Sequence, residues 1–258
     1  MPEMTLSGAC VLFSLLFLAA FVDSAAGGGA LISLPAYLLT GMPIHSVYGT
    51  NKFTAGMAAL FSTGRYLRSG KILLLPTACA CLGAVLGSWL GASLVLLIDE
   101  ALLRTTLLVL LPIAGVFIVL NQRKPPEAQE RKALSRRVTV ALSLTAGFLC
   151  GLYDGFFGPG TGTFLILAFN GILGMEIVTA AGSARTVNLA ANAAALLAYM
   201  AGDKVVWAVA IPGAVFSVLG GQMGTFFAVK QGARLIRPLM VAVVVLLMAK
   251  VAWDFFGG

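Results

Sequence analysis

The chain has 258 residues, of which 59% are hydrophobic and only 10% are charged, and its mean hydropathy is +0.97. Soluble domains carry about 25% charged residues, so this composition excludes a water-soluble globule and indicates a polytopic membrane protein, for which the length supplies about ten spans of ~20 residues. The net charge of +7 is typical of membrane proteins that collect Lys and Arg in cytoplasmic loops, and it implies no nucleic acid partner.

Apolar runs follow one another along the chain from its start, which lacks the basic residues of a signal peptide and is interpreted as the first span. The ten runs cover residues 5–22, 30–40, 44–63, 72–97, 105–120, 138–153, 161–173, 177–200, 205–228 and 238–256. They lack the alternating pattern of membrane strands, and an open sheet cannot satisfy its backbone in lipid. The sequence therefore predicts an all-α polytopic membrane protein with 8 to 10 membrane segments.

The two halves of the chain resemble each other. Asp23 is followed by Gly27–Gly29, and Asp154 is followed by Gly158–Gly160, at an offset of 131 residues. Between the halves lies a stretch with six basic residues and two prolines. We therefore predict two pseudo-symmetric repeats from an internal duplication. The first transmembrane repeat covers 1–120, the basic cytoplasmic linker 121–137 and the second transmembrane repeat 138–258.

The direction of the repeats follows from their positive charges. If all ten runs cross, the repeats are inverted, both termini lie outside, and 12 of the 17 Lys and Arg residues lie on the side of the linker. If 30–40 and 161–173 are re-entrant, the repeats are parallel, and the basic residues at 230–237 lie outside, against the positive-inside rule. We prefer the inverted arrangement. The run 30–40 is short for a span, so it must start from an unwound stretch inside the membrane.

Each half breaks an apolar segment with glycines directly after an aspartate. The glycines predicted to unwind these helices are Gly27, Gly28, Gly29, Gly158, Gly160 and Gly162. Interrupted helices at matching positions of two halves indicate a transporter's binding site, because free amides at the start of a half-helix attract anions. The alternative is that the glycines serve close helix packing or simple hairpin turns.

Two cations, Lys52 and Arg185, lie deep inside apolar runs at matched positions 133 residues apart. A cation at the centre of a membrane helix costs at least ~2.5–3.5 kcal/mol, so we predict that both bind an anionic substrate near the pseudo-twofold axis. The neighbours able to donate hydrogen bonds to its oxygens are Thr50, Asn51, Ser183 and Asn188. The alternative is that the two cations only pair with Asp23 and Asp154.

The aspartates Asp23 and Asp154 are themselves candidates for proton or ion coupling, because a carboxylate at membrane depth usually has a function. Equally, each aspartate could cap the half-helix that follows it. The four cysteines lie in apolar runs and form no array with histidine, so we expect no metal site, disulfide or cofactor. A stripe of glycines at 83, 87 and 91 predicts a helix-packing face, inside the monomer or in a homodimer.

These motifs resemble the TauE/SafE sulfite exporter family, also called the 4-toluene sulfonate uptake permease family, and most closely a subgroup of bacterial inner-membrane proteins. The stretches that carry the resemblance are 23–29, 50–52, 151–159, 184–188 and 235–238. It implies movement of sulfite, sulfonates or related organic anions, and an origin by duplication of a hydrophobic half. One departure is Arg185, where the family pattern leads us to expect Lys; Arg keeps the charge and adds a planar fork. The seven or eight spans usual in the family differ from ten crossings.

Taken together, these features predict a secondary transporter of small anions in the bacterial inner membrane, with membrane lipid as its surroundings. No nucleotide-binding motif occurs, so ion gradients or the substrate's own gradient would supply the energy. Small carboxylates are an alternative substrate class. A membrane enzyme or a sensor without transport is the alternative function, and the sequence disfavours an enzyme because it contains no Cys-His, Ser-His-Asp or metal constellation.

Overall fold

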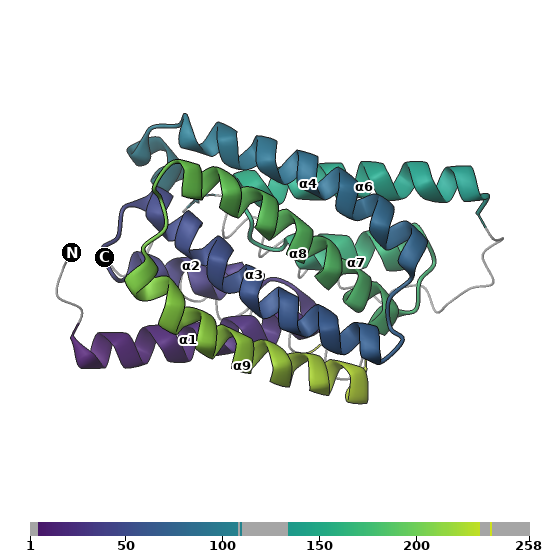
Figure 1. Cartoon of the computed structure of the whole chain (residues 1–258), viewed down its shortest axis with the longest axis horizontal. Coiled ribbons are helices and arrows are strands. Elements are labelled where there is room, and N and C mark those ends of the chain that lie inside the picture. The colour runs from purple at the N-terminus through teal and green to yellow at the C-terminus, as the bar shows by residue number, and fades with distance from the viewer. Residues whose placement is uncertain (1–4, 108, 110–133, 233–237, 239–258) are drawn as a thin grey trace.

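The computed structural model describes residues 5–107, 109, 134–232 and 238, and the regular structure of those residues is entirely helical (Figure 1). The first half contributes α1 (Leu6–Ala26), α2 (Ala30–Leu38), α3 (Ile44–Arg68) and α4 (Leu74–Leu96). The second contributes α6 (Arg136–Phe156), α7 (Thr161–Gly171), α8 (Ile177–Ala201) and α9 (Trp207–Gln231). The predicted all-α class is confirmed. Most of the predicted linker, of the predicted runs 105–120 and 238–256 and of the motif at 235–238 falls outside the described residues.

Four described helices, α1, α4, α6 and α9, are long and apolar enough to cross a membrane. Large hydrophobic side chains on them face outward; Leu82 and Leu86 of α4, for example, are 66% and 63% exposed. An exposed apolar surface of this kind is what lipid requires. The chain is therefore a multi-pass membrane protein.

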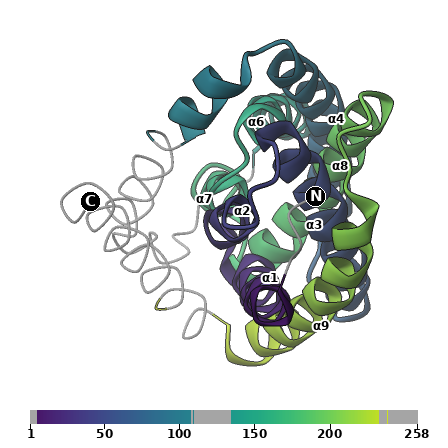
Figure 2. The same cartoon turned by 90° about the vertical axis from the view of Figure 1, so that its left-hand side faces the viewer.

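The helices α3 and α8 carry many of the buried polar residues and pack against each other, with α8 at the right-hand side of Figure 2. Gly49 of α3 has no room for a side chain, because the carbonyl of Lys204 lies where its Cβ would be. Gly182 of α8 meets the carbonyl of Lys71 in the same way. The start of α3 thus lies at the end of α8, and the start of α8 at the end of α3. These matched helices run in opposite directions, as inverted repeats require.

The outer helices pair across the two halves. Glycines of α4 and α6 interlock, so that a Cβ at Gly87 would lie 2.6 Å from the backbone nitrogen of Leu152, and one at Gly151 would lie 2.6 Å from Cα of Ala84. On the other side, the backbone of α1 leaves no room for a side chain at Gly220 or Gly224 of α9. The predicted glycine stripe of α4 is therefore a packing face inside the monomer, where small residues let helix backbones approach closely.

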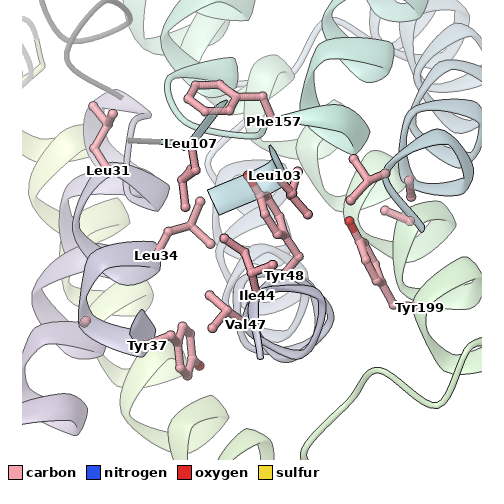
Figure 3. Packing of buried hydrophobic residues seen from close by; sticks show 14 of the residues in the cluster. Leu31, Leu34, Tyr37, Ile44, Val47, Tyr48, Leu103, Leu107, Phe157 and Tyr199 are labelled. Carbon is pink, nitrogen blue, oxygen red and sulfur yellow. The ribbon is translucent and has the colours of Figure 1, made fainter. Parts of the chain in front are cut away.

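A hydrophobic cluster holds α2 against α3 (Figure 3). Tyr48 of α3 stacks on Tyr199 of α8, with ring centroids 6.4 Å apart and planes 7° from parallel. The other large members of the cluster are Leu31, Leu34, Tyr37, Ile44, Val47, Leu103, Leu107 and Phe157. Because lipid is as apolar as leucine, this burial stabilises by close packing more than by removal from water. The cluster fixes the short helix that follows the first glycine break.

Candidate functional site

Glycines with left-handed backbone interrupt both halves. Gly27 and Gly28 have φ of 75° and 88° between α1 and α2, and Gly158 and Gly160 have φ of 90° and 86° between α6 and α7. Residues with a side chain rarely adopt these angles. A Cβ at Gly162 would also lie 2.8 Å from Cα of Gly27. The glycines therefore serve both as turns and as a point of close packing between the two breaks.

After the first break the chain turns back beside α1. Gly29 packs against the side chain of Asp23, so α2 begins next to the last turns of α1. Further along α2, the hydroxyl of Tyr37 lies 3.0 Å from that of Thr54 in α3, and Ser33 donates to the amide oxygen of Asn51 at 2.6 Å. The short helix thus starts inside the protein, as its length predicted.

The first ion pair joins α3 to the second break. The Nζ of Lys52 donates to a carboxylate oxygen of Asp154 at 2.6 Å and to its backbone carbonyl at 2.7 Å. Their side chains are 3% and 6% exposed. Pairing of the buried cation with an aspartate, the alternative to substrate binding, is therefore observed, and the aspartate belongs to the other half.

The second ion pair is the counterpart of the first. Arg185 of α8 donates from Nη1 to the carboxylate of Asp23 at the end of α1. The other oxygen of Asp23 accepts the backbone N–H of Gly29 at 3.0 Å, just before α2 begins. The two alternatives for Asp23, pairing with a cation and capping the next half-helix, are thus realised together.

One cavity of about 600 Å³, open solvent included, touches both ion pairs and both breaks. The predicted site residues that line it are Gly28, Gly29, Asn51, Lys52, Gly158, Gly160, Gly162, Arg185 and Asn188, with Asp23 and Asp154. Gly27 instead lines a second cavity of about 190 Å³. Four residues line both cavities and so lie between them: Asp23, Gly162, Arg185 and Asn188.

Thr50 and Ser183 are not brought to either cavity. The hydroxyl of Thr50 accepts the backbone N–H of Val206 at 3.1 Å, and that of Ser183 accepts the N–H of Leu73 at 3.3 Å. These amides lie at the starts of α9 and α4, where the first backbone N–H groups have no acceptor within their own helix. The two hydroxyls therefore hold helix starts in the opposite half.

Ser33, Tyr48 and Ser217 also line the larger cavity, although the sequence did not single them out. Ser33 could have been found, because it lies four residues after the last glycine of the first break and so in the first turn of α2. Ser217 carries no comparable signal, since a small residue in an apolar helix usually serves packing.

Unused hydrogen-bonding groups remain at this site. In the described part of the chain, Nε and Nη2 of Arg185 and Oδ1 of Asn188 are buried without a hydrogen-bond partner. Buried polar groups are normally paired, so a polar ligand is a natural complement to this cluster. The charges of the two ion pairs sum to zero when all four groups are ionised.

Comparison with known proteins finds relatives that are similar in sequence over nearly the whole chain. Residues 12–251 match the family described as "Sulfite exporter TauE/SafE". The "Probable membrane transporter protein YfcA" of Escherichia coli (strain K12) is 34% identical over 247 residues, which cover 96% of this chain and 90% of the relative. A "Probable membrane transporter protein" of Haemophilus influenzae is 33% identical over 244 residues, 95% of this chain and 94% of the relative. "Probable membrane transporter protein ORF9" of Sinorhizobium sp is 32% identical over 243 residues, 94% of this chain and 92% of the relative. No solved structure matches the chain.

Proposed function

The chain belongs to the TauE/SafE family of membrane transporters, and we propose that it is a secondary transporter of small oxyanions in the bacterial inner membrane. The substrates are sulfite, sulfonates or related organosulfur oxyanions, and small carboxylates are the alternative class. One observation carries the proposal: two buried cations from matched helices line a single cavity together with both glycine breaks.

Burial of the two cations costs free energy. Lys52 and Arg185 are 2% and 3% exposed, and buried ion pairs often contribute little net stability, because desolvation offsets their attraction. Two such pairs beside a cavity are therefore poor devices for stability alone. Each pair places a cation beside the cavity, and the buried amide of Asn188 lines the same cavity; a polar anion needs such partners in order to leave water.

Alternating access fits the arrangement of the two cavities. Asp23, Gly162, Arg185 and Asn188 line both cavities, so the second ion pair stands on the wall between them. The two cavities differ in size, about 600 Å³ against about 190 Å³. We propose that the two inverted repeats exchange conformations during transport, so that the small cavity enlarges as the large one closes.

The test begins with ligand-induced stabilisation of the purified protein by sulfite, methanesulfonate, taurine, thiosulfate, sulfate and small carboxylates. We expect stabilisation by at least one oxyanion class, and flux of the same anion into proteoliposomes. Lys52→Ala and Arg185→Ala should leave the protein inserted but abolish binding, whereas Lys52→Arg should be milder. Full ligand-induced stabilisation in both alanine variants would refute the site.

The proposal includes no covalent chemistry, so the anion recovered from the vesicles should be chemically unchanged. Mass spectrometry of the recovered anion tests this point directly. A converted product would favour the membrane enzyme. Binding without flux would favour the sensor.

A further inference from the structure

The guanidinium of Arg185 is only partly used by the protein. Its Nη1 donates to Asp23, while Nε and Nη2 have no partner within the described residues. The residue is 3% exposed and lines both cavities. An unpaired buried donor costs free energy, and the cost is larger for a charged group. The unused part of this side chain is therefore a candidate contact for a ligand.

The unused atoms form one edge of the guanidinium plane. The N–H of Nε and one N–H of Nη2 point the same way, side by side, and this fork matches two oxygens of a single oxyanion. No carboxylate of the described residues occupies this buried edge. A spherical or linear anion offers only one atom to such a fork and would use half of it.

Asn188 adds a further polar group on the same face. It follows Arg185 by three residues on α8, so both side chains lie on one side of the helix, and it lines the same two cavities. Its Oδ1 is buried without a partner in the described structure. A turn of the amide about its last bond exchanges oxygen for nitrogen, and the side chain then presents a donor to an anion.

Lys52 has fewer unused hydrogen-bond donors than Arg185. Two of its three donors are taken by the carboxylate and the carbonyl of Asp154. An ammonium group is a point charge without a fork, and its bond to the carbonyl anchors the second glycine break. The two cations, although matched in position, are therefore not equivalent.

We infer that the Nε and Nη2 edge of Arg185, with Asn188, is the primary subsite for the substrate's head group, and that it selects anions with two coplanar terminal oxygens. Sulfite, sulfonates and carboxylates belong to this class, whereas chloride and thiocyanate do not. Asp23 keeps Nη1 while the anion occupies the fork. This assignment rests on the proposed function.

The experiment compares Arg185→Lys with its matched control Arg65→Lys, which makes the same exchange on α3 outside both cavities, using methanesulfonate as the probe and calorimetry in detergent as the measurement. Arg185→Lys keeps the charge and can still pair with Asp23 but has no fork, so we expect at least a tenfold weaker Kd. Arg65→Lys should change Kd less than threefold. Asn188→Ala should weaken binding by an intermediate factor. Equal affinities of wild type and Arg185→Lys would overturn the assignment.

A second measurement needs no variant and covers the case in which Arg185→Lys fails to fold. The wild-type protein should bind methanesulfonate at least tenfold more tightly than thiocyanate, which has the same charge. Equal affinity for the two anions would overturn the fork. Absence of any oxyanion binding or flux in the wild type would instead refute the proposed function, so the two failures are distinguishable.

Discussion

Lys52 of α3 and Asp154 of α6 form an ion pair across the two halves of the chain, with Nζ 2.6 Å from Oδ2. Arg185 of α8 and Asp23 of α1 form the reciprocal pair. In each pair the cation comes from α3 or α8 of one half, and the carboxylate precedes the glycine break of the other half. The pairs therefore connect each break to a polar helix of the opposite half.

Removing one member of the first pair should be more damaging than removing both. We expect Lys52→Met to lower the free energy of unfolding by about 3–5 kcal/mol, because it leaves Asp154 buried without its partner. The double variant Lys52→Met with Asp154→Leu should regain much of that loss. Denaturation in detergent micelles measures the wild type, Lys52→Met, Asp154→Leu and the double variant. If the double variant loses as much stability as the two single variants combined, the interpretation is contradicted.

The glycine contacts between α4 and α6 predict a second difference in stability. Gly87→Ala should destabilise by about 1–3 kcal/mol, because the backbone of α6 occupies the position of the new Cβ. Gly64→Ala in α3 is the matched control, since a Cβ there meets nothing within 4 Å. Alanine at 64 should stabilise by up to about 1 kcal/mol through helix propensity. Thermal unfolding of both variants checks the contrast, and equal effects would contradict the packing.

Sequence patterns predicted the all-α class, the broken helices and the deep position of both cations, because each depends on local composition. They left open which carboxylate each cation meets, since Lys52 and Asp154 are 102 residues apart and only the tertiary fold, which brings Lys52 of α3 to the last turn of α6, decides it. The same limit applies to hydroxyl groups. Thr50 is adjacent to useful polar residues in sequence, yet a helix turns about 100° per residue, and the hydroxyl contacts α9 instead of the cavity.

The directions of the helices predict where each loop is accessible. Lys71, Arg136 and Lys230 stand at one end of the described bundle, and Asp203 and Lys204 at the other. The positive-inside rule places the first end in the cytoplasm. In a background without the four native cysteines, a cysteine at Lys204 should react with an impermeant reagent from outside, and one at Lys230 should be protected. The reverse labelling would show that the bundle has the opposite orientation, with the linker end outside.

Glu176 caps the start of α8 and gives a pH dependence of stability. Burial raises the pKa of Glu176, but the hydrogen bonds from the backbone of Val178 and Thr179, together with the nearby Lys71, outweigh it and leave this pKa below its ordinary value. The stability it contributes is therefore present above the unfolded pKa of about 4.3 and is lost as pH falls through the lowered value.

The variant Glu176→Ala should destabilise by about 0.5–2 kcal/mol at pH 7, as loss of a helix cap does, and the difference from wild type should shrink toward pH 3. Lys71→Gln is the control, because its ion pair with Glu176 is 3.5 Å long and exposed and such pairs contribute less than about 1 kcal/mol. Thermal unfolding across pH measures both. A difference that is independent of pH would contradict the charged cap.

The charges beside the cavity favour coupling of anion flux to proton movement. Lys52, Arg185, Asp23 and Asp154 balance one another when all are ionised, so a bound monovalent anion leaves one negative charge uncompensated in a low dielectric. A proton on one carboxylate would restore neutrality. It would also free the paired cation to attract the anion. We therefore expect anion flux through the protein to respond to a pH gradient.

Replacing the responsible aspartate by asparagine should keep anion binding and remove that response, because asparagine preserves shape and can still accept a hydrogen bond but cannot release a proton. At Asp23 the substitution also preserves the cap on the backbone N–H of Gly29, since asparagine caps a helix about as well as aspartate. We would measure flux into proteoliposomes for Asp23→Asn and Asp154→Asn, with and without an imposed pH gradient. The variant that loses the response identifies the aspartate that carries the proton. A parallel measurement with an imposed sodium gradient tests the other common coupling ion. If both variants keep the pH response of the wild type, neither aspartate carries the proton, and the two carboxylates serve only to pair the cations and shape the breaks.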